Sequence, residues 1–372
     1  METLGALLTI NVHIFMLSLL CFIVTIEASK KNKVSAIYVF GDSTVDPGNN
    51  NYVNTAFKSD FPPYGRDLAN QSPTGRFSNG KLGTDFIASY LGLKELVPPY
   101  LDPNLSDEEL MTGVSFASAG SGFDPLTPTL SNVVPIPKQL EYFKQYKKRL
   151  ESKLGRHKTE NHINNAFFFV SAGTNDFVIN YFTVPIRRRS FDVVTYGHFV
   201  LQHVKDFIQN LWTEGARKIA FVGLPPMGCL PIMITFHSNN AFFERSCVDK
   251  YSAVARAHNM ILQHELFSMQ LNFSMQLNFS NPHEHGAKIS YIDIYGPLAN
   301  MIQGHGNLGF DEVHRGCCGS GFIEATFMCN RGSHVCTDPS KYVFWDSIHP
   351  TEKAYHNLFV ANRHILDALI KG

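Results

Sequence analysis

Short apolar stretches alternate with longer segments of helical periodicity along most of the chain. The apolar stretches are rich in β-branched and aromatic residues and lie at 36–40, 113–117, 166–170, 218–224 and 288–294. Segments with apolar positions at helical spacing lie at 81–91, 137–154, 191–215, 247–267 and 351–370. Strands that are apolar on both faces belong to parallel sheets covered by helices on each side. The pattern therefore predicts an α/β fold of three layers, α/β/α, with a parallel sheet in the middle.

The first 28 residues have the features of a signal peptide. Residues 14–26 are almost wholly apolar, but this run is too short to cross a bilayer comfortably. Small residues follow the run, and we expect cleavage after Ala28. An uncleaved membrane anchor is the alternative, because no lysine or arginine precedes the apolar run. No composition break follows the leader, so residues 29–372 are expected to form a single domain with no stable membrane span.

The composition is that of a globular protein without a bias toward a charged partner. The 372 residues are 44% hydrophobic and 17% charged, which suits a chain with a large core. Lysine plus arginine equal aspartate plus glutamate at 32 each, so no overall field favours nucleic acid. We expect a small or neutral substrate, and the oligomeric state stays open.

The cysteines indicate an oxidising compartment. Removal of the leader takes away Cys21 and leaves an even number, all in the second half of the chain: Cys229, Cys247, Cys317, Cys318, Cys329 and Cys336. We expect disulfides in which the adjacent Cys317 and Cys318 pair with other cysteines and not with each other. The sequence leaves the connectivity open. A zinc site within 317–336 is the alternative, and neighbouring cysteines rarely face one ion. The N-x-S sequons at Asn70, Asn104, Asn272 and Asn278 also fit a secreted glycoprotein.

Residues 267–280 contain a short internal repeat. The hexad FSMQLN is written twice and then begun a third time. Two units are too few for a solenoid, so the repeat is a local duplication that lengthens a helix end or a loop. We favour a tolerated surface insertion, and an added apolar lid or contact surface is the alternative.

Ser43 stands where the first apolar stretch ends and a loop rich in Asp, Gly and Asn begins. In an open parallel sheet the ligand site lies beyond the carboxyl ends of the strands. Three expected strands end in polar loops with small residues, GDSTVD, SAGSG and SAGTND. A serine at such a point can cap a helix or close a turn. It can also be a nucleophile exposed at the active edge.

The far end of the chain supplies a base for such a nucleophile. A serine hydroxyl is a poor nucleophile until a base takes its proton, and a third group must orient that base. Asp346 and His349 lie three residues apart, directly before Pro350. This spacing places a carboxylate beside an imidazole, so Asp346 is expected to bind one ring nitrogen while the other faces Ser43.

Acyl transfer also needs donors that stabilise the developing oxyanion. Asn175, in the loop after the third stretch, offers a side-chain amide. The glycine-rich turn 117–122 offers a backbone N–H with no side chain to block the substrate. Each of these residues also suits a simple turn. Asp46 is expected to bind backbone N–H groups and to hold the loop after Ser43 in place.

Three motifs, FGDSTVDPGNNN, GTNDF and DSIHP, occur in this order and together resemble the plant branch of the GDSL esterase/lipase family, the SGNH hydrolases. The resemblance covers essentially the whole mature chain, since PPYGRD, VGLPPMGCLP and CCGSG are also similar to that group's connecting segments. It implies a secreted hydrolase with a flavodoxin-like fold, an ester substrate, and no metal or other cofactor.

The family's marker residues carry over by motif. The serine corresponds to Ser43, the asparagine to Asn175 and the histidine to His349, and Asp346 takes the role of the triad carboxylate. The glycine falls in the turn 117–122, where the sequence departs from the family pattern: Ser115 stands where an asparagine is usual. Counting from that position gives Gly120 as the oxyanion donor, with Gly122 as the alternative.

Three hypotheses about function follow. The favoured one is a carboxylester hydrolase, secreted to the apoplast or cell wall, that cleaves acyl esters of lipids or cutin-like monomers through an acyl-serine intermediate. The second is an O-acetyl esterase that uses the same residues on cell-wall polysaccharide. The third is a non-catalytic extracellular binding protein, because a fold alone does not fix a function.

Overall fold

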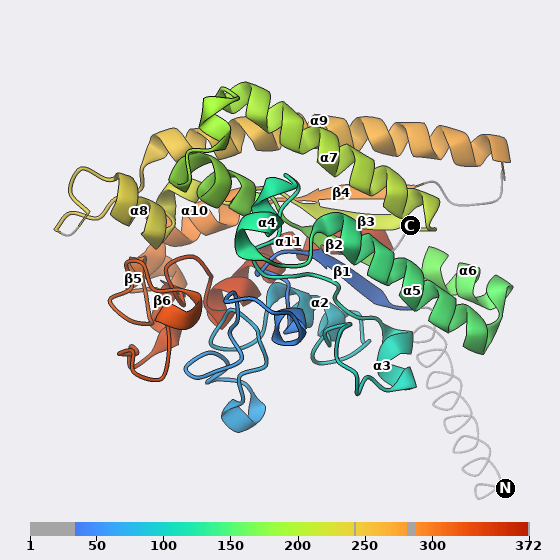
Figure 1. Cartoon of the computed structure of the whole chain (residues 1–372), viewed down its shortest axis with the longest axis horizontal. Coiled ribbons are helices and arrows are strands. Elements are labelled where there is room, and N and C mark those ends of the chain that lie inside the picture. Colours follow the sequence, from blue (N-terminus) through green and yellow to red (C-terminus); the bar gives the residue numbers. More distant parts are fainter. Residues whose placement is uncertain (1–33, 242, 281–286, 371–372) are drawn as a thin grey trace, which may run out of the picture. The chain divides into compact units, whose positions relative to one another are not determined.

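A parallel sheet lies at the centre of the structure (Figure 1). The computed structural model describes residues 34–370, apart from 242 and 281–286. The strands run in the order β1 (Ile37–Gly41), β2 (Phe167–Ser171), β3 (Lys218–Val222) and β4 (Lys288–Ile292). In the register, Tyr38 lies opposite Phe168, and Phe168 lies opposite Ile219. Four of the five expected strands are therefore confirmed.

The stretch 113–117 is not a regular strand, so this prediction was wrong. It is extended and lies beside β1, where Val39 N donates to Val114 O and Phe116 N donates to Val39 O at 2.7 Å. On its other side Ser115 N donates to Pro98 O and Ser115 O accepts from Tyr100 N, both at 2.9 Å, and the Asn49 side chain also donates to the carbonyls of Ser115 and Ala117. The stretch thus pairs through isolated bridges, to Val39 and to Pro99. The stretch lies on the side of β1 that faces away from β2. The spatial order of the five apolar segments is therefore still that of a flavodoxin-like sheet.

The helices that the sequence predicts are present with shifts at their ends: α2 (Gly83–Tyr90), α5 (Ile136–Leu154), α7 (Val193–Thr213), α9 (Asp249–Ser280) and α11 (Glu352–Ile370). Further elements include α3 (Asp107–Thr112), α4 (Leu126–Ser131), α6 (Arg156–Asn164), α8 (Pro231–His237), α10 (Tyr295–Gln303), a π-helix (Asp176–Thr183) and a parallel pair of strands, β5 (Glu312–Gly316) and β6 (Tyr342–Phe344). Short 3₁₀ turns occur at Asn49–Tyr52, Ala69–Gln71, Arg187–Arg189, Met227–Cys229, His305–Leu308, Thr326–Met328 and Pro339–Lys341.

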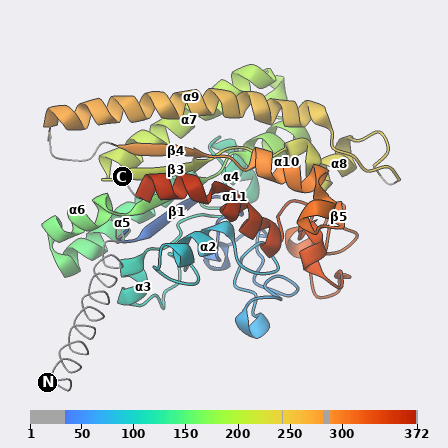
Figure 2. The same cartoon turned by 180° about the vertical axis from the view of Figure 1, so that it is seen from behind.

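Helices cover both faces of the sheet. Figure 1 shows α5 and α7 in front of the strands, and Figure 2, seen from behind, shows α2 and α11 on the opposite face. Successive strand side chains point to opposite faces, so Tyr38 and Phe40 join the core under α5 and α7, whereas Ile37 and Val39 join the core under α2 and α11. The prediction of a three-layer α/β/α fold is therefore confirmed.

The repeat at 267–280 is part of α9 and not an unpacked insertion. Six residues of an α-helix span more than one and a half turns, so equivalent residues of the two copies face different directions. Phe267 is 58% exposed, whereas Phe273 is 2% exposed and stacks on Trp212 of α7, with ring centroids 4.5 Å apart. The second copy thus begins with a residue packed in the core, which corrects the expectation of a tolerated surface insertion.

All six cysteines of the described residues form disulfides: Cys229–Cys247, Cys317–Cys336 and Cys318–Cys329. The adjacent Cys317 and Cys318 do pair with other cysteines and not with each other. Their sulfur atoms are therefore not available to a zinc ion. Asn70, Asn104 and Asn272 are exposed. The leader and the side chain of Asn278 lie outside the described residues, and no helix of the described part is long and apolar enough to cross a membrane.

Residues Val34–Ile370 form one compact unit. The expected domain, 29–372, begins and ends outside the described residues, so its boundaries stay a prediction.

Gln139 joins helix α5 to the carboxyl end of β1. Its Oε1 accepts a hydrogen bond from Gly41 N at 2.9 Å, and its Nε2 donates to Gly41 O at 2.8 Å. Gln139 is fully buried. One side chain therefore satisfies both backbone groups of the residue at which the strand ends.

Replacing Gln139 by alanine should leave Gly41 N buried without a partner, whereas Gly41 O still accepts a hydrogen bond from Ser118 N at 3.0 Å. We expect Gln139→Ala to lower the free energy of unfolding by about 1–3 kcal/mol. Denaturant unfolding measures this change, and Gln145→Ala, at an exposed position of the same helix, is the control. Equal stability of the two variants would contradict the role of Gln139.

Candidate active site

Ser43 lies directly after a sharp turn at the end of β1. Gly41 has a φ of 142°, and a Cβ atom there would lie 1.9 Å from the carbonyl oxygen of Ser171, so only glycine fits. Asp42 then closes a local turn, because its Oδ1 accepts hydrogen bonds from the backbone and hydroxyl of Thr44. Burial raises the pKa of Asp42 to about 6, against the opposing effect of these hydrogen bonds and of His349. The turn directs Ser43 away from the sheet edge.

Ser43, His349 and Asp346 form one hydrogen-bonded chain. His349 Nε2 lies 2.8 Å from Ser43 Oγ, and its Nδ1 lies 2.7 Å from Asp346 Oδ2. Both backbone N–H groups of Ile348 and His349 donate to Asp346 Oδ1, at 2.9 and 2.7 Å. The structure thus brings together residues that are 306 positions apart in the sequence. This is the relationship of nucleophile, base and orienting carboxylate.

Tyr64 forms a further hydrogen bond to the carboxylate of Asp346. The Tyr64 hydroxyl donates to Asp346 Oδ2 at 2.8 Å and accepts a hydrogen bond from Thr326 N at 2.9 Å. Burial, followed by the Asp346 charge, raises the pKa of Tyr64 well above its usual value, so the hydroxyl stays a donor. Phe77 packs against the His349 ring with a centroid distance of 4.8 Å. The carboxylate and the imidazole are therefore both held in one orientation.

Two disulfides support the loop that carries Asp346 and His349. Cys317 N donates to Phe344 O at 3.0 Å, and Cys318 N donates to Trp345 O at 2.9 Å. These cysteines form a buried cluster with their disulfide partners, Tyr64, Phe77, Ala119 and Trp345. The bridges thus fix the backbone immediately before Asp346.

Asn175 and the turn 117–122 lie together. Asn175 Nδ2 donates one hydrogen bond to Ser121 O at 2.8 Å. An amide NH₂ has two hydrogens, so this contact fixes the side chain and leaves a second donor. Asn175 is 8% and Ser43 is 7% exposed. Both side chains are therefore largely buried, each with a small exposed fraction.

The two candidate glycines of this turn differ in their surroundings. Gly120 has a φ of 85°, and a Cβ there would meet Phe57 and Ser131. Gly122 packs against Asp176, whose Oδ1 would lie 2.2 Å from an added Cβ. Burial raises the pKa of Asp176 to about 7. Neither position has room for a side chain, so Gly120 stays the predicted oxyanion donor, with Gly122 as the alternative.

Polar side chains after Ser43 tie its loop to the turn 117–122. Asp46 accepts hydrogen bonds from the backbone of Gly48, Asn49 and Ala119, at 2.8, 2.7 and 2.9 Å. Burial raises the pKa of Asp46 to about 6, while these hydrogen bonds act in the opposite direction. Asn50 Nδ2 also donates to Ala119 O. The geometry is the one expected for Asp46, and it fixes the nucleophile loop relative to the glycine turn.

Sequence comparison adds an independent finding. Residues 37–361 match the GDSL-like lipase/acylhydrolase family. The chain belongs to the GDSL esterase/lipase family. It is 57% identical over 344 residues to GDSL esterase/lipase At5g45960 of Arabidopsis thaliana, covering 92% of this chain and 89% of the relative. It is 44% identical over 352 residues to At1g58430, covering 93% of each chain, and 42% identical over 334 residues to At1g06990, covering 90% and 89%; both are GDSL esterase/lipases of the same plant.

Membership of this family makes the chain a carboxylic ester hydrolase, and the resemblance to the plant branch is confirmed. All the residues that the family motifs assign, Ser43, Gly120, Asn175, Asp346 and His349, lie at the carboxyl end of the sheet or in the loop that follows β6. Among the described residues, no group of three or more His, Cys, Asp or Glu is arranged to hold a metal ion.

Sequence reasoning missed Gln139 and Tyr64. Gln139 carried a signal, because it is an amide on the otherwise apolar face of a helix. Tyr64 carried none, because it lies in irregular chain and meets Asp346 only in the folded structure. Both act through other residues and position the site.

Replacing Tyr64 by phenylalanine removes a hydrogen bond to the orienting carboxylate. We expect Tyr64→Phe to lower kcat for a soluble ester roughly tenfold with little change in KM. Steady-state kinetics measure the two constants separately, with Tyr342→Phe, at the edge of the same cluster, as the control. A variant with unchanged kcat would show that Tyr64 does not position Asp346.

Proposed function

We propose that the protein is a secreted serine esterase that cleaves acyl esters through Ser43, His349 and Asp346. The observation that carries this proposal is the pair of contacts of one imidazole, 2.8 Å to the serine oxygen and 2.7 Å to the carboxylate. Membership of the GDSL esterase/lipase family supports the same reaction class.

The first half-reaction forms an acyl-serine. His349 Nε2 takes the proton of Ser43 Oγ as the oxygen attacks the ester carbonyl carbon. Asp346 accepts a hydrogen bond from Nδ1 and stabilises the imidazolium. The imidazolium then gives its proton to the departing alcohol, and the bond between the carbonyl carbon and the alcohol oxygen breaks.

The second half-reaction restores the enzyme. Water attacks the acyl-serine while His349 Nε2 takes one of its protons, and the carboxylic acid leaves as the proton returns to Ser43 Oγ. In both halves the oxyanion accepts hydrogen bonds from Ser43 N, Gly120 N and the free Nδ2 hydrogen of Asn175. No external oxidant, reductant or metal takes part in this scheme.

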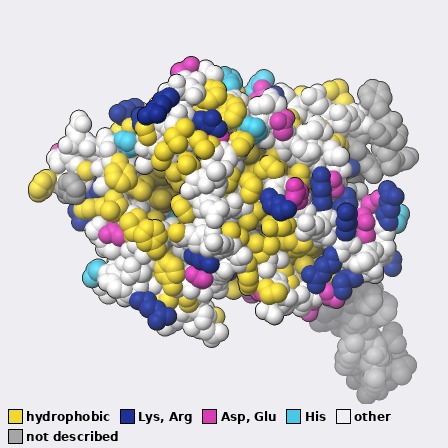
Figure 3. All heavy atoms as spheres, in the orientation of Figure 1, with side chains coloured by type: hydrophobic (Ala, Val, Ile, Leu, Met, Phe, Trp, Pro, Cys, Tyr) yellow, Lys and Arg dark blue, Asp and Glu magenta, His cyan; other side chains and the backbone are white. Residues whose placement is uncertain are grey.

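Disulfides and surface charge support the proposed setting. Stable disulfides form in oxidising compartments, and three bridges are present in the described residues. Figure 3 shows a dense group of Lys and Arg side chains where α5 and α6 lie, whereas apolar side chains dominate around α4 and α8. Lys144 and Lys147 of α5 pair with Glu214, and Arg149 and Lys153 pair with Asp107, so acidic neighbours offset part of the charge of this group. With no net charge on the chain, a neutral ester in the apoplast or cell wall is the favoured substrate.

Removal of the nucleophile tests the proposal directly. We expect Ser43→Ala to lower kcat/KM for p-nitrophenyl esters at least about 10⁴-fold, because no other hydroxyl contacts His349 Nε2 among the described contacts. Ser152→Ala, at an exposed serine of α5, should keep full activity. Substantial turnover by folded Ser43→Ala would exclude the proposed mechanism.

Asn175 provides a separate test of the oxyanion site. We expect Asn175→Ala to lower kcat roughly 10²–10³-fold, the usual effect of losing one oxyanion donor. Asn175→Asp is the matched variant of the same shape, and its negative charge should lower kcat at least as far. If kcat survived in both variants, Asn175 would hold Ser121 but would not stabilise the oxyanion.

The remaining hypotheses differ in substrate. Wild-type protein that hydrolyses acetylated xylan but not longer acyl esters would be a polysaccharide O-acetyl esterase. Folded wild-type protein without turnover on any ester would favour the binding protein.

A further inference from the structure

An apolar cavity lies between the sheet and the helices α2 and α11. Thr44, Thr174 and Ile348 line it, and each is next in the chain to a member of the proposed catalytic set. The far part of the lining comes from Phe169 in the middle of β2 and from Leu366 near the end of α11. The cavity therefore begins beside the catalytic residues and extends back along the strands.

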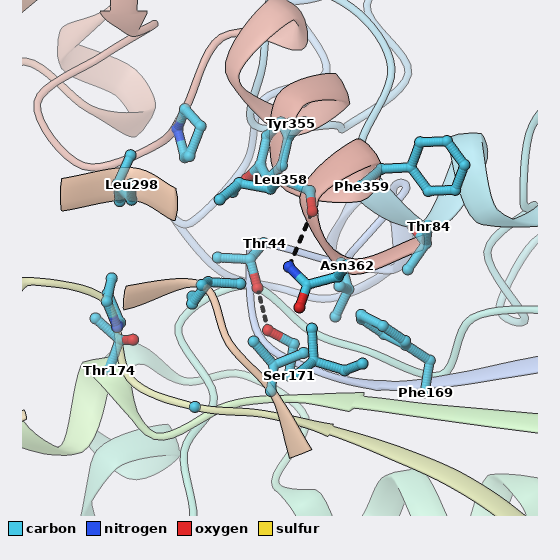
Figure 4. Close-up of a pocket in the computed structure, with 18 of the residues that line it drawn as sticks. Thr44, Thr84, Phe169, Ser171, Thr174, Leu298, Tyr355, Leu358, Phe359 and Asn362 are labelled. Atoms are coloured by element: carbon cyan, nitrogen blue, oxygen red, sulfur yellow. Dashed lines mark hydrogen bonds between the residues drawn. The ribbon is translucent and has the colours of Figure 1, made fainter. Parts of the chain in front are cut away.

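Two opposite walls form the cavity. Figure 4 shows Tyr355, Leu358 and Phe359 projecting from α11 on one side and Phe169 and Ser171 from β2 on the other. Most of these walls are buried in the core under α2 and α11. The wall is thus made by rigid elements and not by a surface loop.

The polar groups of the lining are largely satisfied by the protein. Thr44 Oγ1 and Ser171 Oγ lie 2.8 Å apart, and Asn362 Nδ2 donates to Asp293 O at 2.8 Å. The Tyr355 hydroxyl is buried and has no hydrogen-bond partner within the described part of the chain. A buried water needs two to four polar partners, and one free hydroxyl does not supply them. The cavity suits an apolar occupant.

The size of the cavity sets the size of that occupant. The volume of the cavity is about 100 Å³. A cavity of roughly 150 Å³ holds one benzene molecule, so this cavity holds roughly four carbon atoms.

We propose that this cavity receives the acyl chain of the ester and selects chains of about four carbon atoms. The inference rests on the proposed function, because the chain is attached to the carbonyl carbon that Ser43 attacks. With the carbonyl oxygen near Asn175, the chain leaves between Thr174 and Ile348 and enters the cavity. Burial of each methylene contributes to binding the acyl group.

A second hollow lies on the other side of the sheet, between α4, α5 and α7. It is larger, but its lining includes the polar side chains of His203, Asp206 and Asn210. It approaches the proposed catalytic set only through Gly122 and Phe123. An acyl chain is matched less well there, and this groove is the alternative that the experiment must distinguish.

Gly83 allows the cavity to be filled without disturbing the catalytic residues. It lines the cavity on α2, and a Cβ added there would make an ordinary contact with the Tyr355 ring at 3.8 Å. Its φ is not in the left-handed region, so a side chain is tolerated. Gly83→Leu should fill part of the cavity, and Gly83→Ala should fill less. Gly306→Leu, where an added Cβ meets nothing within 4 Å, is the matched control.

The experiment compares kcat/KM for p-nitrophenyl acetate, butyrate and octanoate. We expect the wild type to prefer butyrate. We expect Gly83→Leu to lower the butyrate to acetate ratio at least tenfold while acetate turnover persists, with Gly83→Ala between it and the wild type and Gly306→Leu unchanged. Leu366→Phe, which fills the cavity from α11, should lower the same ratio and provides a second variant if Gly83→Leu does not fold.

Other results would overturn the inference. An unchanged ratio in both Gly83→Leu and Leu366→Phe would place the acyl chain outside the cavity, in the groove beside α4 or in solvent. A wild-type preference for acetate over butyrate would also exclude it. Failure of the proposed function looks different, because then no ester is hydrolysed or the Ser43→Ala variant hydrolyses all of them.

Discussion

The close approach of Gly41 to Ser171 at the end of the sheet is the constraint on which the rest of the site depends. A strand that continued straight would carry Ser43 on along the sheet edge. The absence of a side chain at Gly41 lets β1 turn against the Ser171 carbonyl, and Gln139 holds the turn by both backbone groups of Gly41. The position of Ser43 is therefore set by a helix and two strands and not by its own loop alone.

Three chain segments meet at this turn, and each is fixed by contacts that catalysis itself does not use. The nucleophile loop is joined to the glycine turn through Asp46 and Asn50. Asn175 is joined to the same turn through Ser121. The segment with Asp346 is held by disulfides and by Tyr64. Preorganised donors and acceptors of this kind stabilise charge without reorganisation during the reaction.

Much of this arrangement could be predicted from the sequence, because it depends on local patterns. The apolar stretches gave four of the five strands, and the spacing of Asp346 and His349 predicted their contact. The stretch 113–117 was assigned as a strand because its residues are apolar, but in the structure it pairs through isolated bridges, to Val39 and to Pro99.

Other features depend on contacts between distant segments. The disulfide connectivity and the Tyr64 contact join residues whose proximity no local pattern encodes. The repeat in α9 was misjudged because a period of six does not match the helical period, so the burial of one copy does not predict that of the other. The cavity beneath the site likewise arises only when α2 and α11 pack on the sheet.

Covalent labelling tests the central claim, an activated nucleophile at Ser43, most directly. The measurement is the intact mass of the purified protein after treatment with an alkyl p-nitrophenyl phosphonate, followed by peptide mapping. The account predicts one phosphonyl group per chain, located at Ser43, and much slower labelling of His349→Ala. Labelling at another residue, or none in the folded wild type, would contradict it.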